Sequence, residues 1–239
     1  MSDWYNELIE WAEQQSIPDS IIPKNKKKIL GLTELNLISH TFVELPESIG
    51  NLTNLNTLHL GWWGKKCELT KLPKSIGNLK NLSCITLFNN KLTELPESFD
   101  NLTRLTILDL DSNHLINLPE SIGNLKNLRT LILQNNKLTL LPETIGNLSH
   151  LEWLNLGNNQ LTELPESFGN LSNLKKLTLQ NNKLTALPCS FGNLTNLEKL
   201  NLRNNKFSEI PEVIGSLTNI IDLDKQTTER FLQQYIEVQ

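Results

Sequence analysis

The sequence lacks the features that define several large protein classes. Its 239 residues include three cysteines, Cys67, Cys84 and Cys189, whose irregular spacing supports neither a disulfide framework nor a zinc site. No run of about 18 apolar residues is present, so no transmembrane helix is predicted. The formal net charge of −4 gives no general attraction for nucleic acid or for an anionic membrane.

The amino-terminal segment lacks the basic region and the long apolar run of a Sec signal peptide. Unpaired thiols are also typical of a reducing compartment. We therefore expect a cytoplasmic protein, and export by a route that needs no Sec signal is the alternative.

The most informative positive feature is an internal repeat. Its units open at Leu32, Leu55, Leu82, Leu105, Leu128, Leu151, Leu174, Leu197 and Ile220. Successive openings are 23 residues apart, except for the 27 residues between Leu55 and Leu82, so the second unit carries four extra residues (27 − 23). One unit, residues 151–173, reads LEWLNLGNNQLTELPESFGNLSN. Residues 32–219 thus form eight units.

Each part of the unit predicts a local structure. Buried leucines that alternate with exposed residues, as around Leu154 and Leu156, indicate a short strand with one buried face. The amide of Asn159 can satisfy backbone groups at the end of that strand. The Leu164-Pro165 pair excludes a central strand or helix interior and predicts a polyproline-like or 3₁₀ return segment. The following Gly-Asn pair (169–170) predicts a tight or left-handed turn. Equivalents of Asn159 recur as an asparagine ladder at Asn90, Asn113, Asn136, Asn182 and Asn205.

A single unit cannot fold alone. It offers about seven apolar side chains worth roughly 1.5–3 kcal/mol each, against a backbone ordering cost of roughly 1–2 kcal/mol for each of its residues. The units must therefore stack, and eight parallel strands should span roughly 35–40 Å.

The two ends of the stack need covers. Residues 1–31 are predicted to form a helical cap, because Trp4, Leu8, Trp11 and Ala12 share one helix face. The lysine-rich run 24–28 is interpreted as a solvated lead into the first strand, with a nucleic-acid or nuclear-import patch as the alternative. Residues 220–239 are predicted to form a second helical cap, with an apolar stripe at Phe231, Leu232, Tyr235 and Ile236.

The repeated run L-P-E-S-[IF]-G-N-L, as in residues 45–52 and 164–171, resembles the 23-residue leucine-rich repeats of many bacterial proteins. It is also similar to the repeats of the intracellular Ras-group leucine-rich-repeat proteins. The resemblance implies a leucine-rich-repeat solenoid with a parallel β-sheet on its concave face and a polyproline or 3₁₀ convex side. It also implies a protein-binding role.

The candidate binding residues are those that depart from the repeat on the exposed strand positions. Ile107, Ile132 and Trp153 are predicted to form an apolar diagonal, with Phe88 at its edge, because neighbouring strands lie about 4.8 Å apart. Charged residues divide into a central acidic pair and a carboxyl-terminal basic group, which are Asp109 and Asp111, and Lys176, Lys199 and Arg203.

The insertion in the second unit spans residues 61–68 and contains Trp62 and Trp63 between two glycines. Exposed indole rings on a loop suit partner binding. A structural plug for a packing gap is the alternative interpretation.

No catalytic constellation is recognisable. The four histidines, His40, His59, His114 and His150, fall in different units, and no phosphate-binding glycine motif is present. We expect a monomeric, non-catalytic protein–protein interaction module with no cofactor and no metal ion. The alternative is a regulator of an enzyme such as a small GTPase, or an effector-like bacterial protein that acts on a host partner.

Overall fold

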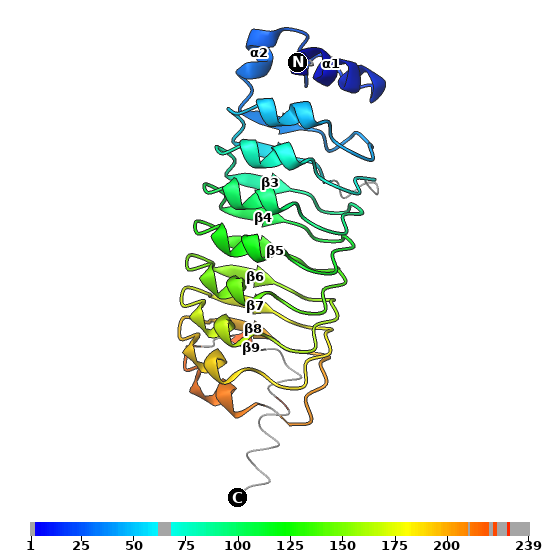
Figure 1. The fold of residues 1–239 in the computed structure, drawn as a ribbon. Coiled ribbons are helices and arrows are strands. Elements are labelled where there is room, and N and C mark those ends of the chain that lie inside the picture. The colour runs from blue at the N-terminus through cyan, green and yellow to red at the C-terminus, as the bar shows by residue number, and fades with distance from the viewer. Residues whose placement is uncertain (1–2, 62–67, 210, 220–221, 224–228, 230–239) are drawn as a thin grey trace, which may run out of the picture.

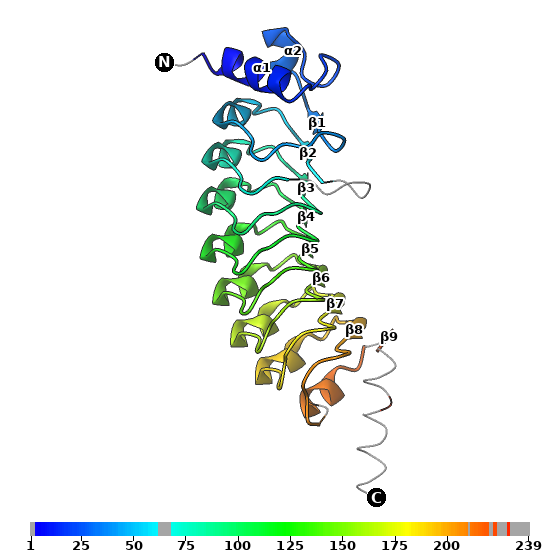
Figure 2. The ribbon, with the colours of Figure 1, turned by 90° about the vertical axis from the view of Figure 1, so that its right-hand side faces the viewer.

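The computed structural model describes residues 3–61, 68–209, 211–219, 222–223 and 229. The chain is a curved stack of repeats, with short parallel strands on the concave side and 3₁₀ helices on the convex side (Figures 1 and 2). The solenoid and its 3₁₀ convex side are thus confirmed.

Nine strands are hydrogen-bonded in sequence order, and each pairs in parallel with the next. The register aligns equivalent positions of neighbouring repeats, as in Leu131↔Leu154. A ninth strand lies within the segment assigned to the carboxyl-terminal cap, where residues 220–223 repeat the start of a unit. The strands are β1 (Glu34–Asn36), β2 (Thr57–His59), β3 (Cys84–Thr86), β4 (Ile107–Asp109), β5 (Thr130–Ile132), β6 (Trp153–Asn155), β7 (Lys176–Thr178), β8 (Lys199–Asn201) and β9 (Asp222–Leu223).

The return segment of each described unit ends in a one-turn 3₁₀ helix. Proline precedes each helix in an extended conformation, as at Pro165 with φ −68° and ψ 154°, which is the polyproline region. The helices are η1 (Glu47–Asn51), η2 (Lys74–Asn78), η3 (Glu97–Asn101), η4 (Glu120–Asn124), η5 (Glu143–Asn147), η6 (Glu166–Asn170), η7 (Cys189–Asn193) and η8 (Glu212–Ser216). One continuous core of leucine, isoleucine and phenylalanine fills the space between strands and helices.

Of the two alternatives predicted for the Gly-Asn pair, a tight or a left-handed turn, the structure has the tight one. Gly169 lies inside η6, and no described glycine has a positive φ. A Cβ at this position would lie 2.2 Å from the carbonyl oxygen of Ser190 in the next repeat. Glycine is therefore required here by the close stacking of successive 3₁₀ helices rather than by backbone conformation.

The asparagine ladder is confirmed. The Asn159 side chain accepts a hydrogen bond from Leu138 N at 3.0 Å and donates to the carbonyl oxygens of Leu133 and Leu156 at 2.9 and 3.1 Å. A second, outer ladder lies beside it, in which Asn158 donates to Asn135 Oδ1 at 2.7 Å. Members of the outer ladder have a left-handed backbone in the third to eighth units, as at Asn158 with φ 54°.

The amino-terminal helix α1 (Trp4–Gln14) begins at Asp3, whose side chain accepts a hydrogen bond from Tyr5 N. It lies across the first repeat and packs against η1 (Figure 2). Leu8 and Ala12 are buried, and the rings of Trp11 and Phe42 meet edge to face at 5.3 Å. The helix therefore covers the core of the first unit.

The lysine-rich run forms part of a second short helix, α2 (Lys26–Leu30), which begins at Asn25. Its lysines are exposed, and the ammonium of Lys26 lies 5.4 Å from the centre of the Trp4 ring. Lys24 pairs with Glu13 at 2.7 Å. Lys24 and Lys26 thus hold the run against α1. The predicted carboxyl-terminal cap helix lies outside the described residues.

Candidate functional site

The concave face is organised in rows that run across the strands. One row places Ile107, Thr130, Trp153 and Lys176 side by side on β4 to β7. A second row, two residues further along each strand, brings Asp109, Ile132 and Asn155 together. Each row consists of side chains that point away from the leucine core.

The predicted apolar diagonal is replaced by a triangle. Ile107 and Trp153 occupy the same row on either side of Thr130, and Ile132 lies in the next row on the strand between them. Ile107 is 40% exposed and Trp153 is 38% exposed, whereas Ile132 is half-buried. We call these four residues, Ile107, Thr130, Ile132 and Trp153, the concave patch.

Phe88 does not join the concave patch. It is half-buried and lies in a third row, one strand before β4. A Cβ on Gly61 would lie 2.9 Å from Phe88 Cδ1, so the ring leans over the preceding repeat. The prediction missed this direction because it depends on the glycine one repeat away.

Asp109 lies beside the concave patch and is half-buried. Its Oδ1 accepts a hydrogen bond from Asp111 N at 3.0 Å. Burial raises the pKa of the Asp109 carboxyl, and the nearby charge of Asp111 adds to that effect. No ion pair to Asp109 is present among the described residues.

Asp111, predicted to be an exposed partner contact, is instead buried, with 7% exposure. Its Oδ1 accepts hydrogen bonds from Asn135 Nδ2 at 2.9 Å and from Ser112 Oγ at 3.2 Å. The carboxylate connects the outer asparagine ladder where Ser112 interrupts it. Its position therefore indicates a structural role.

The basic residues lie toward the carboxyl-terminal end of the same face. Lys176 is exposed, and its ammonium lies 5.9 Å from the centre of the Trp153 ring. Lys199 follows in the same row on β8, and Arg203 lies just after that strand. Both are exposed. Trp62 and Trp63, the other candidate binding residues, lie outside the described residues.

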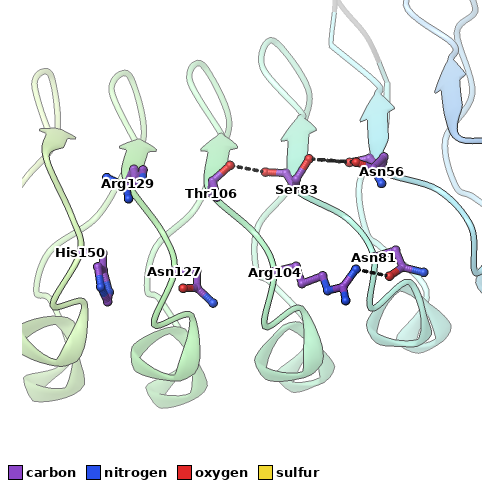
Figure 3. A pocket seen from close by; sticks show the side chains of 8 residues that line it. All are labelled: Asn56, Asn81, Ser83, Arg104, Thr106, Asn127, Arg129 and His150. Carbon is purple, nitrogen blue, oxygen red and sulfur yellow. Dashed lines mark hydrogen bonds between the residues drawn. The ribbon is translucent and has the colours of Figure 1, made fainter.

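A further surface was not predicted. A polar trough of about 420 Å³ follows the amino-terminal edge of the sheet, where the strands begin (Figure 3). It is lined by Asn56, Asn81, Ser83, Arg104, Thr106, Asn127, Arg129 and His150. The sequence feature that could have indicated this surface is the residue before each opening leucine. It is asparagine in most units, but it is Arg104 in one unit and His150 in another.

The remaining titratable groups do not form a catalytic arrangement. The ring of His59 hydrogen-bonds to Thr86 Oγ1 at 2.9 Å. Burial raises the pKa of the Cys84 thiol, and Asp109 raises it further, which favours the unreactive thiol over the thiolate. Within the described ranges, no cluster of histidine, cysteine and acidic residues could hold a metal ion. No helix in that part of the chain is long and apolar enough to cross a membrane.

Comparison with known proteins identifies the repeat. A leucine-rich-repeat region model matches residues 23–110, 59–137 and 143–237, and a second leucine-rich-repeat model matches 119–161. A comparison with curated proteins returned no match.

Solved structures agree with this result. A leucine-rich-repeat protein of Leptospira interrogans is 40% identical with a TM-score of 0.77, over 84% of this chain and 52% of its own length. The ectodomain of the Arabidopsis thaliana receptor kinase GASSHO1/SCHENGEN3 is 29% identical with a TM-score of 0.67, and the match covers 87% of this chain and 28% of the receptor chain. An internalin from Listeria monocytogenes is 25% identical with a TM-score of 0.63, and the match covers 84% of this chain and 64% of the internalin chain.

This chain thus spans about half of the Leptospira protein and a smaller share of the plant receptor. The family models cover most of its length, and the fold shows the repeat in every described unit. The chain therefore belongs to the leucine-rich-repeat family, whose fold serves in general as a protein–protein interaction module.

Proposed function

We propose that this chain is a non-catalytic module that binds a protein partner through the concave patch. The observation that carries the proposal is the exposure of Ile107 and Trp153 in one row of a rigid sheet, with Ile132 between them in the next row. Exposed apolar side chains that are held by a scaffold remove water at little entropic cost when a partner covers them.

The surroundings of the patch resemble a binding hot spot. Trp153 supplies an aromatic anchor at one side of the patch, and polar residues flank the patch, which is the usual composition of the energetic core of an interface. Asp109 on one side and Lys176 on the other supply charges of opposite sign. A partner that pairs with both would be oriented along the solenoid axis.

The relatives are consistent with such a role. The ectodomain of the plant receptor kinase was solved in complex with CASPARIAN STRIP INTEGRITY FACTOR 2. That complex concerns the plant receptor, and it supports the general proposal that this fold presents a binding surface.

The concave patch is tested by Trp153→Ala combined with Ile132→Ser. We expect partner capture to fall at least about tenfold, because loss of a central aromatic anchor commonly costs about 2 kcal/mol or more. The melting temperature should change little, because Trp153 is exposed and neither residue belongs to the leucine core. Capture on immobilised protein, quantified by mass spectrometry, measures the effect.

The matched control is Ile116→Ser combined with Leu140→Ala. These side chains are 49% and 47% exposed and lie after the strands, in the fourth and fifth units, the fifth of which also contains Ile132. The control should keep full capture. Equal losses in both double variants would contradict the proposal, since any exposed apolar group would then suffice.

Asp109 gives a test that depends on pH. Equivalent positions hold Asn36, Asn155 and Asn201, each of which accepts the same backbone hydrogen bond from two residues further on. Asp109→Asn therefore keeps that bond and removes a partly buried charge. Because burial raises the pKa of Asp109 in the folded state, its ionised form destabilises the fold above that pKa.

We expect Asp109→Asn to raise the melting temperature at about pH 7, because the unfolded carboxyl is ionised there and burial opposes that charge in the folded state. The gain should vanish in acid, below the ordinary aspartate pKa of about 3.9, because the carboxyl is then protonated in both states. Calorimetry of both proteins across this range measures the difference. A gain that persists in acid would show that charge burial is not its cause.

The insertion that contains Trp62 and Trp63 is proposed as a second contact region, on the strength of its sequence. Replacing both tryptophans with serine should weaken capture and leave the melting temperature intact. A large drop in melting temperature, with capture retained by the folded fraction, would instead support a structural plug. Capture and melting assays on the same preparation separate the two outcomes.

A further inference from the structure

The amino-terminal edge of the sheet carries its own row of asparagines. At six positions before an opening leucine, an asparagine side chain donates to a main-chain carbonyl of the preceding turn of the chain, as in Asn127 Nδ2 to Thr103 O at 2.7 Å. For Asn54 that turn is α2, whose last residue, Leu30, is the acceptor. These amides connect each turn to the previous one. The six are Asn54, Asn81, Asn127, Asn173, Asn196 and Asn219.

Two residues interrupt this row, and they do so differently. His150 replaces the amide in function, since its Nδ1 lies 2.7 Å from the carbonyl oxygen of Lys126 and must donate to it. Arg104 does not replace the amide. Its Nη1 donates to Asn81 Oδ1 at 2.8 Å, and the guanidinium lies along the trough (Figure 3). At this position, where most units have a stabilising asparagine, the chain therefore has a cation, Arg104, and this hydrogen bond of its guanidinium is to a side chain and not to a main-chain carbonyl.

The next row explains why a hollow exists beside Arg104. Ser83 and Thr106 are short, and their hydroxyls hydrogen-bond to main-chain carbonyls of the preceding repeats. In the sixth to eighth units the same row holds long charged side chains, Glu152, Lys175 and Glu198. The trough therefore ends where the side chains lengthen.

The charge of the trough is positive. Arg104 and Arg129 line it, and no carboxylate does. Glu152, at its end, pairs with both Arg129 and Lys175, so its charge is shared between two cations. Arg104 forms no ion pair in the part of the chain that the structure describes.

We propose that this trough is an anion-binding site in which Arg104 binds a side-chain carboxylate of an acidic protein segment, with Arg129 further along the trough. The two guanidinium groups point in opposite directions along the solenoid, because that of Arg104 reaches back to Asn81 and that of Arg129 reaches forward to Glu152. Arg129 already pairs with Glu152, so Arg104 is the residue that binds the anion. Guanidinium binds carboxylate through paired charge-assisted hydrogen bonds, and the surrounding amides and hydroxyls can satisfy further oxygens.

The trough adjoins the concave patch, because Thr106 and Arg129 directly precede Ile107 and Thr130 in the chain. A partner segment could therefore place an acidic side chain in the trough and an apolar side chain on the patch. The proposal does not depend on the concave patch, since it rests on different side chains at the strand edge.

The decisive variant is Arg104→Asn, because it restores the residue found at the other row positions. Folding should be preserved, and the melting temperature should stay equal or rise, since the asparagine can again donate to the preceding repeat. The control is Lys137→Asn, which removes the same charge from an exposed position at the opposite edge of the sheet. The probe is a fluorescein-labelled hexaglutamate peptide, with hexaglutamine as its neutral counterpart, measured by fluorescence anisotropy.

We expect Arg104→Asn to weaken hexaglutamate binding by about fivefold to tenfold, and Lys137→Asn by less than about twofold. Arg104→Lys should retain part of the affinity, because it keeps the charge but loses the planar donor pair. Equal losses in the asparagine variants would overturn the proposal, because binding would then follow net charge alone. So would equal binding of hexaglutamine.

Two further measurements distinguish carboxylate binding at the trough from phosphate binding there and from binding at the concave patch. Inorganic phosphate that displaces the peptide at much lower concentration than acetate, at matched ionic strength, would contradict a carboxylate ligand. The Trp153→Ala/Ile132→Ser protein should bind hexaglutamate as the wild type does. Failure of the trough and failure of the concave patch therefore give different results.

Discussion

Replacing Asn159 with alanine is expected to lower the free energy of unfolding by about 2–6 kcal/mol. One buried amide loses its partner at roughly 1–3 kcal/mol, and two buried carbonyls each lose one of two asparagine donors at roughly 0.5–1.5 kcal/mol, because Asn136 and Asn182 still donate to them. These groups are the amide of Leu138 and the carbonyls of Leu133 and Leu156. Asn159 lies in a central repeat and is almost fully buried, so water cannot replace its amide without opening the stack. Chemical denaturation followed by circular dichroism gives the difference.

The adjacent residue provides the control. Asn158→Gly keeps the left-handed backbone that this position requires, because glycine adopts positive φ freely. It removes only side-chain hydrogen bonds of the outer ladder and should cost less than about 1.5 kcal/mol. If the two variants were equally stable, the inner ladder would not be what closes the strand ends.

Deleting residues 1–28 should have the second large effect. Without α1, the core of the first repeat around Ile49 and Phe42 loses its cover, because Leu8, Ala12 and Trp11 pack there. End repeats that expose apolar cores to water lower the stability of the array and promote association. We expect the truncated chain to elute as aggregates in size-exclusion chromatography and to melt at a lower temperature.

The control keeps the helix and removes only its exposed charge contacts. Lys24→Gln with Lys26→Gln breaks the pairing with Glu13 and the approach to the Trp4 ring. Exposed ion pairs contribute little to stability, so this variant should stay unaggregated and melt near the wild type. A truncated chain with unchanged elution and melting would show that the helix is not a cap.

The repeat could be predicted well because its determinants are local and recur. A leucine such as Leu154 is buried in every unit for the same reason, so its spacing alone places the strand and its register against the next unit. The inner asparagine ladder was predictable on the same ground. The reason for glycine at position 169 was not predictable, because it comes from the close approach of Ser190 in the next repeat.

The binding surface was predicted less completely, because exposed side chains respond to their neighbours. Asp111 and Asp109 are two residues apart and look alike in the sequence. The structure buries Asp111 under Asn135 and Ser112 and leaves Asp109 half-buried on the face. The Phe88 ring leans over Gly61 in the preceding repeat and so lies away from the concave patch. The register alone decides that Ile107 and Trp153 share a row.

The trough could have been predicted in part, because the sequence contains a sign of it at the position before each opening leucine. Arg104 differs from the asparagine at equivalent positions, and a departure from a residue that stabilises the repeat is itself informative. Its meaning depends on the structure, which places the side chain beside Ser83 and Thr106 in a hollow without carboxylates.

Site-specific photo-crosslinking tests the central claim most directly. A benzophenone amino acid in place of Thr130 lies within the concave patch, and one in place of Glu97 lies on the convex 3₁₀ helix η3. We predict a single major protein adduct from position 130, abolished when Trp153→Ala and Ile132→Ser are added, and none from position 97. Adducts from position 97 that match those from position 130, or an adduct at position 130 unaffected by the double variant, would contradict binding through this face.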